Sequence, residues 1–125
     1  MWDMRQIPGI LVVVSLIHGC AVTSLDGRRM GVASEAFAEY VETVFRRQNE
    51  VATALATELD GAEPGSERYR VLEVAELNLL TACQGLNELA SSIRSGGSGR
   101  ASGSLRRARQ APDCEQAAAA AEALL

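Results

Sequence analysis

The sequence predicts a small all-α domain, an antiparallel helical hairpin plus a shorter C-terminal helical segment docked onto it by a disulfide. Three observations predict this fold. Two long stretches carry apolar residues at helical spacing, a short turn with glycine and proline joins them, and aromatic residues make up only 4% of the 125-residue chain. Ala- and Leu-rich helices can pack without large rings. A single bundle of three to four helices is therefore expected over residues 35–125.

The first long helix is expected to begin after Ser34, an N-cap residue, with Glu35 in the first turn, where an acid suits the helix dipole. A stripe of mostly apolar residues then recurs at steps of three and four: Phe37, Val41, Val44, Gln48, Val51 and Leu55. This heptad-like spacing predicts a helix that runs to about Leu59. The following segment, with two glycines and Pro64, breaks it.

A second long helix is expected from its cap, Ser66, to the glycine-rich segment that starts at Gly96. Its stripe keeps the same spacing: Leu72, Ala75, Leu79, Ala82, Leu86, Leu89 and Ile93. Val71, Leu80 and Cys83 flank this stripe, so the wide apolar face predicts contact with more than one neighbour. The short connection between the two helices predicts that they run antiparallel.

The C-terminal part of the chain is expected to hold a linker and two short helices. Residues 96–104 are rich in glycine and serine, which is typical of a flexible linker. A short helix is expected over 105–110, and Pro112 interrupts any longer one. Asp113, with Gln116 three residues later, resembles a capping box for a last, alanine-rich helix.

The first nineteen residues have the features of an export signal. Residues 7–17 are apolar and uncharged, too few for a membrane-spanning helix of about 20 residues but suited to the hydrophobic region of a signal peptide. Asp3 cancels the charge of Arg5 ahead of this region, and a start at Met4 would leave a more basic head. Residues 1–19 are therefore assigned to a signal peptide.

The end of this segment resembles the lipobox, the processing motif of bacterial lipoproteins. Ile17, Gly19 and Cys20 match its aliphatic, small and cysteine positions, whereas His18 stands where a small or aliphatic residue is usual. The resemblance covers the first twenty residues. It implies a diacylglycerol on the Cys20 thiol, cleavage between Gly19 and Cys20, and acylation of the new amine. The alternatives are an ordinary cleaved signal followed by an unrelated cysteine, and an uncleaved N-terminal anchor.

The lipobox resemblance also implies a location and a membrane partner. Two or three acyl chains anchor a protein stably where one does not. The residue after the cysteine is Ala21 and not aspartate, which in lipoproteins of Gram-negative bacteria implies the outer membrane, facing the periplasm. Residues 20–34 are expected to form the lipidated N-terminus and a solvated tether, because 21–33 lack periodicity. Arg28 and Arg29 would add only about 1 kcal/mol each near anionic headgroups.

The two remaining cysteines, Cys83 and Cys114, form an even pair in an oxidising compartment once Cys20 is lipidated. A bridge between them would close a loop of about 31 residues, worth roughly 3–4 kcal/mol in the chain-entropy model. That is a large share of the stability of so small a core. Two buried free thiols are the alternative, and a metal site is disfavoured without histidine.

A polar contact is expected inside the hairpin, because Gln48 interrupts the apolar stripe of the first helix and Asn49 lies beside it. If the chain turns near residue 63, position 48 lies level with position 78. We therefore expect Gln48, or its neighbours Arg46 and Asn49, to meet Glu76 or Asn78 and to set the register of the helices. A recognition site for a peptide or carboxylate is the alternative function of these residues.

The inventory of reactive side chains argues against an enzyme. All twelve basic residues are arginine, and the single histidine, His18, lies in the signal segment. The glutamates that share helix faces lack the histidine of di-iron sites and are expected to be solvated. No nucleophile elbow, phosphate loop or zinc spacing occurs. No cofactor or metal is expected, and a net charge of −4 without blocks of like charge argues against nucleic acid.

These features predict a non-catalytic envelope lipoprotein that binds a protein partner or has a structural role. Its overall plan is similar to that of the helical secretin pilotins and of other small helical lipoproteins of proteobacteria, an analogy at the level of the fold. The alternative is a binder of lipid, lipopolysaccharide or a cell-wall polymer. That function would need an apolar cavity between the second and third helices, or a cluster of arginines such as Arg100, Arg106, Arg107 and Arg109.

Overall fold

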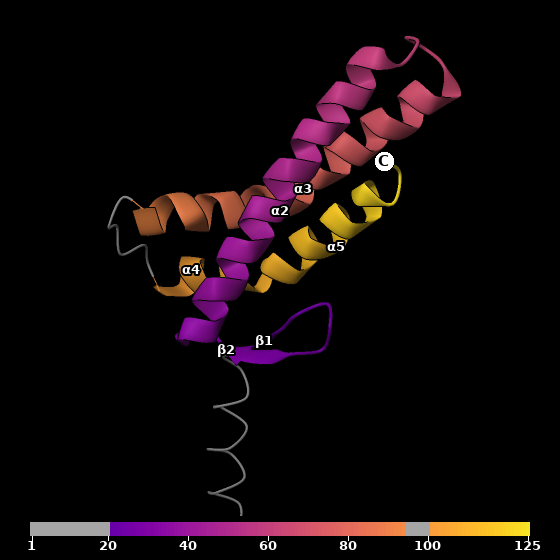
Figure 1. Cartoon of the computed structure of the whole chain (residues 1–125). Helices are drawn as coiled ribbons and strands as arrows, with labels where there is room; N and C mark the ends of the chain where they lie inside the picture. Colours follow the sequence, from indigo (N-terminus) through magenta and orange to yellow (C-terminus); the bar gives the residue numbers. More distant parts are fainter. Residues whose placement is uncertain (1–20, 95–100) are drawn as a thin grey trace, which may run out of the picture.

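The computed structural model describes residues 21–94 and 101–125 (Figure 1). Its elements are, in chain order, β1 (Ala21–Thr23), β2 (Arg29–Gly31), α2 (Glu35–Gly61), α3 (Glu67–Arg94), α4 (Ala101–Arg109) and α5 (Ala111–Glu122). The predicted all-α bundle is confirmed, with a small two-stranded sheet added to it. The signal peptide, the cleavage site at Gly19 and Cys20, and residues 95–100 of the linker lie outside the described residues.

Helix α2 begins where its cap predicts. The Ser34 hydroxyl accepts a hydrogen bond from the Phe37 backbone N–H at 3.1 Å, which satisfies one of the free donors of the first turn. The helix ends at Gly61, two residues beyond the expected end at Leu59. Its buried face contains the whole predicted stripe and one further residue: Phe37, Tyr40, Val41, Val44, Gln48, Val51 and Leu55.

Helix α3 is capped by Ser66, whose hydroxyl accepts from the Tyr69 backbone N–H at 3.1 Å. Its buried residues are Leu72, Leu79, Cys83, Leu86 and Leu89. The prediction of several neighbours is confirmed, because α3 contacts α2, α4 and α5. In Figure 1, α3 starts beside the top of α2, passes behind it and emerges on the other side. The two helices therefore cross along their length.

The C-terminal helices differ from the expectation in two places. Helix α4 begins at Ala101, so residues 101–104 are helical and not linker. Helix α5 begins at Ala111 with Pro112 in its first turn, where the missing N–H of proline costs no helical hydrogen bond. Asp113 is therefore not the cap. It lies in the first turn, and the cap position is held by Gln110, whose side chain makes no capping hydrogen bond.

The predicted disulfide is present. Cys83 of α3 and Cys114 of α5 are bridged, with their Cα atoms 4.5 Å apart, and both residues are fully buried. At the other end of α5, the Arg68 guanidinium donates to the Leu124 carbonyl at 2.7 Å. Helix α5 consequently runs antiparallel to α3, and its buried alanines, Ala111, Ala118 and Ala121, allow close packing.

The segment expected to be a solvated tether is instead a folded β-hairpin, and this part of the expectation was wrong. Strands β1 and β2 pair antiparallel, with Val22 opposite Met30. Both side chains are only 4% exposed and belong to the same core as Phe37. Gly27 supplies the positive φ of +87° in the turn. Strands of three residues are too short for an alternating pattern to stand out in the sequence.

Candidate functional site: a groove between α3 and α5

A groove of about 1120 Å³ lies between α3 and α5. Small side chains line its base, namely Ala75, Ala82, Ala117 and Ala121, and larger aliphatic side chains form its edges, namely Val71, Val74, Leu77 and Leu124. The alanines that let α5 approach α3 closely also leave this space unfilled. An apolar hollow between helices is the kind of site in which proteins bind apolar ligands or helices.

Helix α5 separates this groove from the β-hairpin. Glu115 and Glu122 of α5 face the other way, since Glu115 contacts Leu25 and Tyr40 and Glu122 contacts Arg47. Asp113, Ala117 and Ala120, which line the groove, each lie two residues from one of these glutamates, near the opposite face of the helix. The groove is therefore open to the surroundings on a side that the hairpin does not cover.

Three large aliphatic side chains of α3 remain uncovered: Val74 and Leu77 line this groove, whereas Leu80 lines a separate hollow with Gln84 and Arg107. Val74, Leu77 and Leu80 are 57%, 64% and 57% exposed, respectively. With Val71 they recur every three residues, and each step of three turns about 60° backward around an α-helix. These side chains therefore wind around α3 away from the core face that holds Leu72 and Leu79, and the described helices leave them exposed.

The sequence contained a partial signal for this site. The apolar face of the second helix was predicted to be wide, with Val71 and Leu80 at its flanks, and both are exposed here, at 41% and 57%. Val74 and Leu77 were not singled out. A signal for them was present, because this helix contains more apolar residues than a single buried stripe at helical spacing requires.

Polar residues surround the apolar part of the groove. Glu67 and Arg70 lie at one end, and Asp113 and Gln116 at the other, while Asn78 and Thr81 lie along the α3 edge. The lining thus carries two carboxylates and one guanidinium. The predicted arginine cluster does not add to it, because Arg107 lies against Glu88, with its Nε 3.3 Å from Glu88 Oε2, and Arg100 lies outside the described residues.

The predicted polar contact of the hairpin exists, but with a different partner. Gln48 is buried, and its Nε2 donates to Asn87 Oδ1. Asn49 instead donates to the Phe45 carbonyl of its own helix at 3.0 Å. Asn78 lines the groove, and neither it nor Glu76 is the partner of Gln48. Because α3 crosses α2, counting residues from the turn misplaced the partner by nine positions along α3 (Figure 1).

We expect Gln48→Leu to lower the free energy of unfolding by about 1–2 kcal/mol, because the Asn87 amide loses its partner. Asn87 is partly exposed, so water can replace part of the lost bond and the cost stays moderate. Chemical denaturation followed by circular dichroism measures the change. Asn49→Leu is the control, since Asn49 is exposed and bonds only within its helix. A Gln48→Leu protein that is more stable than wild type would contradict this role.

A second cluster of polar residues holds the β-hairpin against α2 and α5. Glu115 Oε1 accepts hydrogen bonds from the Leu25 backbone N–H at 2.6 Å and from the Tyr40 hydroxyl at 3.1 Å. Burial and the adjacent Glu115 carboxylate raise the pKa of the Tyr40 phenol. The cluster lines a smaller, polar hollow. These hydrogen bonds join the β-hairpin, α2 and α5, so we assign the cluster a structural role.

The raised pKa of Tyr40 makes the fold sensitive to alkali. The pKa of this phenol is higher in the folded state than its usual value near 10. Its contribution to stability is therefore complete below about pH 10 and is lost as the pH rises further. We therefore expect the thermal midpoint of the wild type to fall above about pH 10. Tyr40→Phe should be less stable at neutral pH but should lose less on alkalinisation. The chain has no lysine, so few other groups titrate in this range. If the thermal midpoints of wild type and Tyr40→Phe fell equally steeply with rising pH, the expectation would be contradicted.

Within residues 21–94 and 101–125, no three histidine, cysteine, aspartate or glutamate side chains lie together as a metal site would require. No helix in the same part of the chain is both long and apolar enough to cross a bilayer. Comparison of the chain with protein-family models, curated proteins and solved structures found no significant match.

Proposed function

We propose that this protein is a lipid-anchored, non-catalytic component of the bacterial envelope that binds a helix of a protein partner in the α3–α5 groove. The observation that carries the proposal is the exposure of Val74 and Leu77 in the lining of an apolar hollow. Contiguous exposed aliphatic side chains of this kind mark interaction surfaces. An amphipathic helix that lays its apolar face into a groove is a common mode of recognition.

The dimensions of the groove suit a short helix. Its lining on α3 extends from Glu67 to Ala82, fifteen residue steps that rise roughly 22 Å, or about four helical turns. A partner helix of that length can present three or four apolar side chains on one face. The amides and hydroxyls along the rim, from Asn78, Thr81 and Gln116, can bond to its polar flanks.

The charges of the lining favour a peptide over an anionic lipid. Phosphates of lipopolysaccharide or phosphatidylglycerol would meet two carboxylates, Glu67 and Asp113, and a single cation, Arg70. A helix with neutral or basic flanks meets no such repulsion. We therefore place lipid binding second, as the outcome that the experiment below must exclude.

Two features support the envelope and the lipid anchor. The Cys83–Cys114 disulfide is typical of proteins that fold in an oxidising compartment, and it uses both cysteines other than Cys20. Cys20 itself ends the segment that resembles a lipobox, with Ile17 and Gly19 before it. Ala21 as the following residue favours the outer membrane over the inner membrane in Gram-negative cells.

Intact-mass measurement of protein extracted from the native host tests the anchor. We expect a chain that begins at Cys20 and carries two or three fatty acids, and we expect Cys20→Ser to abolish acylation and membrane recovery. A chain that retains its apolar leader, or one without fatty acid, would refute the lipid anchor while leaving the groove to be tested separately.

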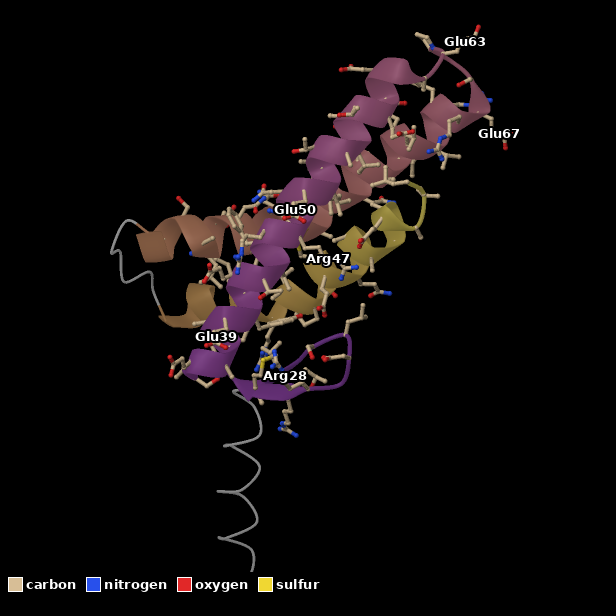
Figure 2. All side chains as sticks on the ribbon, viewed as in Figure 1. Arg28, Glu39, Arg47, Glu50, Glu63 and Glu67 are labelled. Atoms are coloured by element: carbon tan, nitrogen blue, oxygen red, sulfur yellow. A yellow bond between two sulfur atoms is a disulfide. The ribbon has the colours of Figure 1, made fainter. Side chains whose placement is uncertain are left out.

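Site-specific photocrosslinking in cells tests the groove. A photoreactive side chain at position 77 should join the protein to a helical segment of one partner, and Val74→Arg should prevent that product. The same group at position 50, an exposed glutamate of α2, is the matched control and should give no such product (Figure 2). Crosslinks to lipid or lipopolysaccharide, crosslinks between two copies of this chain, or equal products from positions 77 and 50 would each overturn the proposal.

A further inference from the structure

The proposed lipid anchor would be attached directly to the folded body of the domain. Ala21, the residue after Cys20, is the first residue of β1 and pairs with Gly31. The next residue, Val22, lies in the core together with Met30. Consecutive Cα atoms are about 3.8 Å apart, so an acylated Cys20 leaves no length of free chain between the lipid and the sheet. The hairpin must then lie at the level of the lipid headgroups.

The exposed side chains of the hairpin suit that position. Leu25, in the turn, is 54% exposed, although its backbone N–H is bound by Glu115. Arg28 and Arg29 are also exposed on this short element. Asp26 is the acidic residue of the turn, and it accepts a hydrogen bond from the Ser24 hydroxyl. An aliphatic side chain next to arginines is the combination that enters the interface of an anionic membrane.

The opposite end of the molecule is the acidic loop between α2 and α3. The loop between α2 and α3 lies far from the hairpin, and Figure 2 shows Glu63 and Glu67 there and Arg28 at the hairpin end. Glu58 and Asp60 add to the acidic residues near this loop, and Arg68 is paired with Glu58. Helix α2 connects the two ends with 27 residues, roughly 40 Å. Acidic residues, Asp26 and Glu39 among them, also lie at the hairpin end, so the exposed Leu25 beside two arginines, and not net charge, distinguishes that end from the loop.

We propose that the β-hairpin is a membrane-contact surface, with Leu25, Arg28 and Arg29 resting on anionic phospholipid headgroups. The inference rests on the proposed acylation of Cys20, because the acyl chains supply the anchoring and the hairpin sets the orientation. The α2–α3 loop then points away from the bilayer. The α3–α5 groove, which lies across α5 from the hairpin, stays free for a protein partner.

Tryptophan fluorescence can test this orientation, because the only tryptophan of the chain, Trp2, precedes Cys20 and is removed with the signal. Leu25→Trp and Glu63→Trp each place one reporter at an exposed position, at opposite ends of the molecule. The acylated proteins are reconstituted into vesicles of phosphatidylethanolamine and phosphatidylglycerol at about three to one, with or without brominated acyl chains. Brominated chains should reduce the fluorescence of Leu25→Trp roughly twofold or more and leave that of Glu63→Trp unchanged.

The outcomes separate this inference from the proposed function. Protein that carries no fatty acid by mass refutes the anchor itself. Acylated, vesicle-bound protein in which Leu25→Trp is not quenched, or in which both reporters are quenched equally, overturns the hairpin as the contact surface and leaves the anchor intact. Vesicles of brominated phosphatidylcholine alone should quench Leu25→Trp less than the vesicles that contain phosphatidylglycerol. Equal quenching by the two kinds of vesicle would overturn the part assigned to Arg28 and Arg29.

Discussion

The double variant Cys83→Ala/Cys114→Ala is expected to lose about 3–4 kcal/mol of its free energy of unfolding, because it releases the constraint on a loop of about 31 residues. Both sulfurs are fully buried, so the alanines also leave some unfilled space. Urea denaturation followed by circular dichroism measures the loss. Wild-type protein unfolded with and without a reducing agent provides an independent comparison with no substitution.

The loss should be concentrated in α5. This helix has 12 residues, and an isolated helix of that length is marginal in water even when rich in alanine. In hydrogen-exchange measurements, the backbone amides of α5 should therefore lose protection before those of α2. Because α5 forms one wall of the groove, the variant should also fail to bind the partner helix that we propose for it. A variant as stable as wild type, or one with undiminished protection in α5, would show that packing alone docks this helix.

Leu79→Ala is expected to cost about 3–5 kcal/mol, because Leu79 is only 1% exposed and its truncation leaves a cavity between α3 and its neighbours. In a domain of this size such a loss removes a large part of the total stability. The thermal midpoint and the urea midpoint should both fall sharply. Residual stability close to that of wild type would mean that the core collapses around the missing side chain.

Leu77→Ala is the matched control, two residues away on the same helix. Leu77 is 64% exposed, so its truncation should change stability by less than about 0.5 kcal/mol. The two variants should therefore affect different properties of the protein. Leu79→Ala should impair folding, whereas Leu77→Ala should fold normally and weaken partner binding in the groove. Strong destabilisation by Leu77→Ala would show that this side chain has a partner within the fold.

Local features of the sequence were sufficient to predict the long helices and the disulfide. Ser34 and Ser66 cap their helices as expected, and the stripe from Phe37 to Leu55 is the buried face of α2. Capping needs only neighbouring backbone N–H groups, and a helical stripe needs only the regular rotation of about 100° per residue. The pairing of Cys83 with Cys114 followed from the count of cysteines and the compartment that the signal implies.

The remaining features depend on where distant parts of the chain meet, and no local pattern encodes that. The hairpin is stable because Val22 and Met30 enter a core that α2 helps to form and because Glu115 of α5 binds its turn. Gln48 meets Asn87 because α3 crosses α2. The groove exists because small alanines draw α5 against one side of α3 and leave Val74 and Leu77 uncovered. The sequence alone determined which segments are helical and which side chains are apolar. The crossing of the helices and the packing of α5, which only the tertiary structure reveals, decided which of those side chains remain exposed.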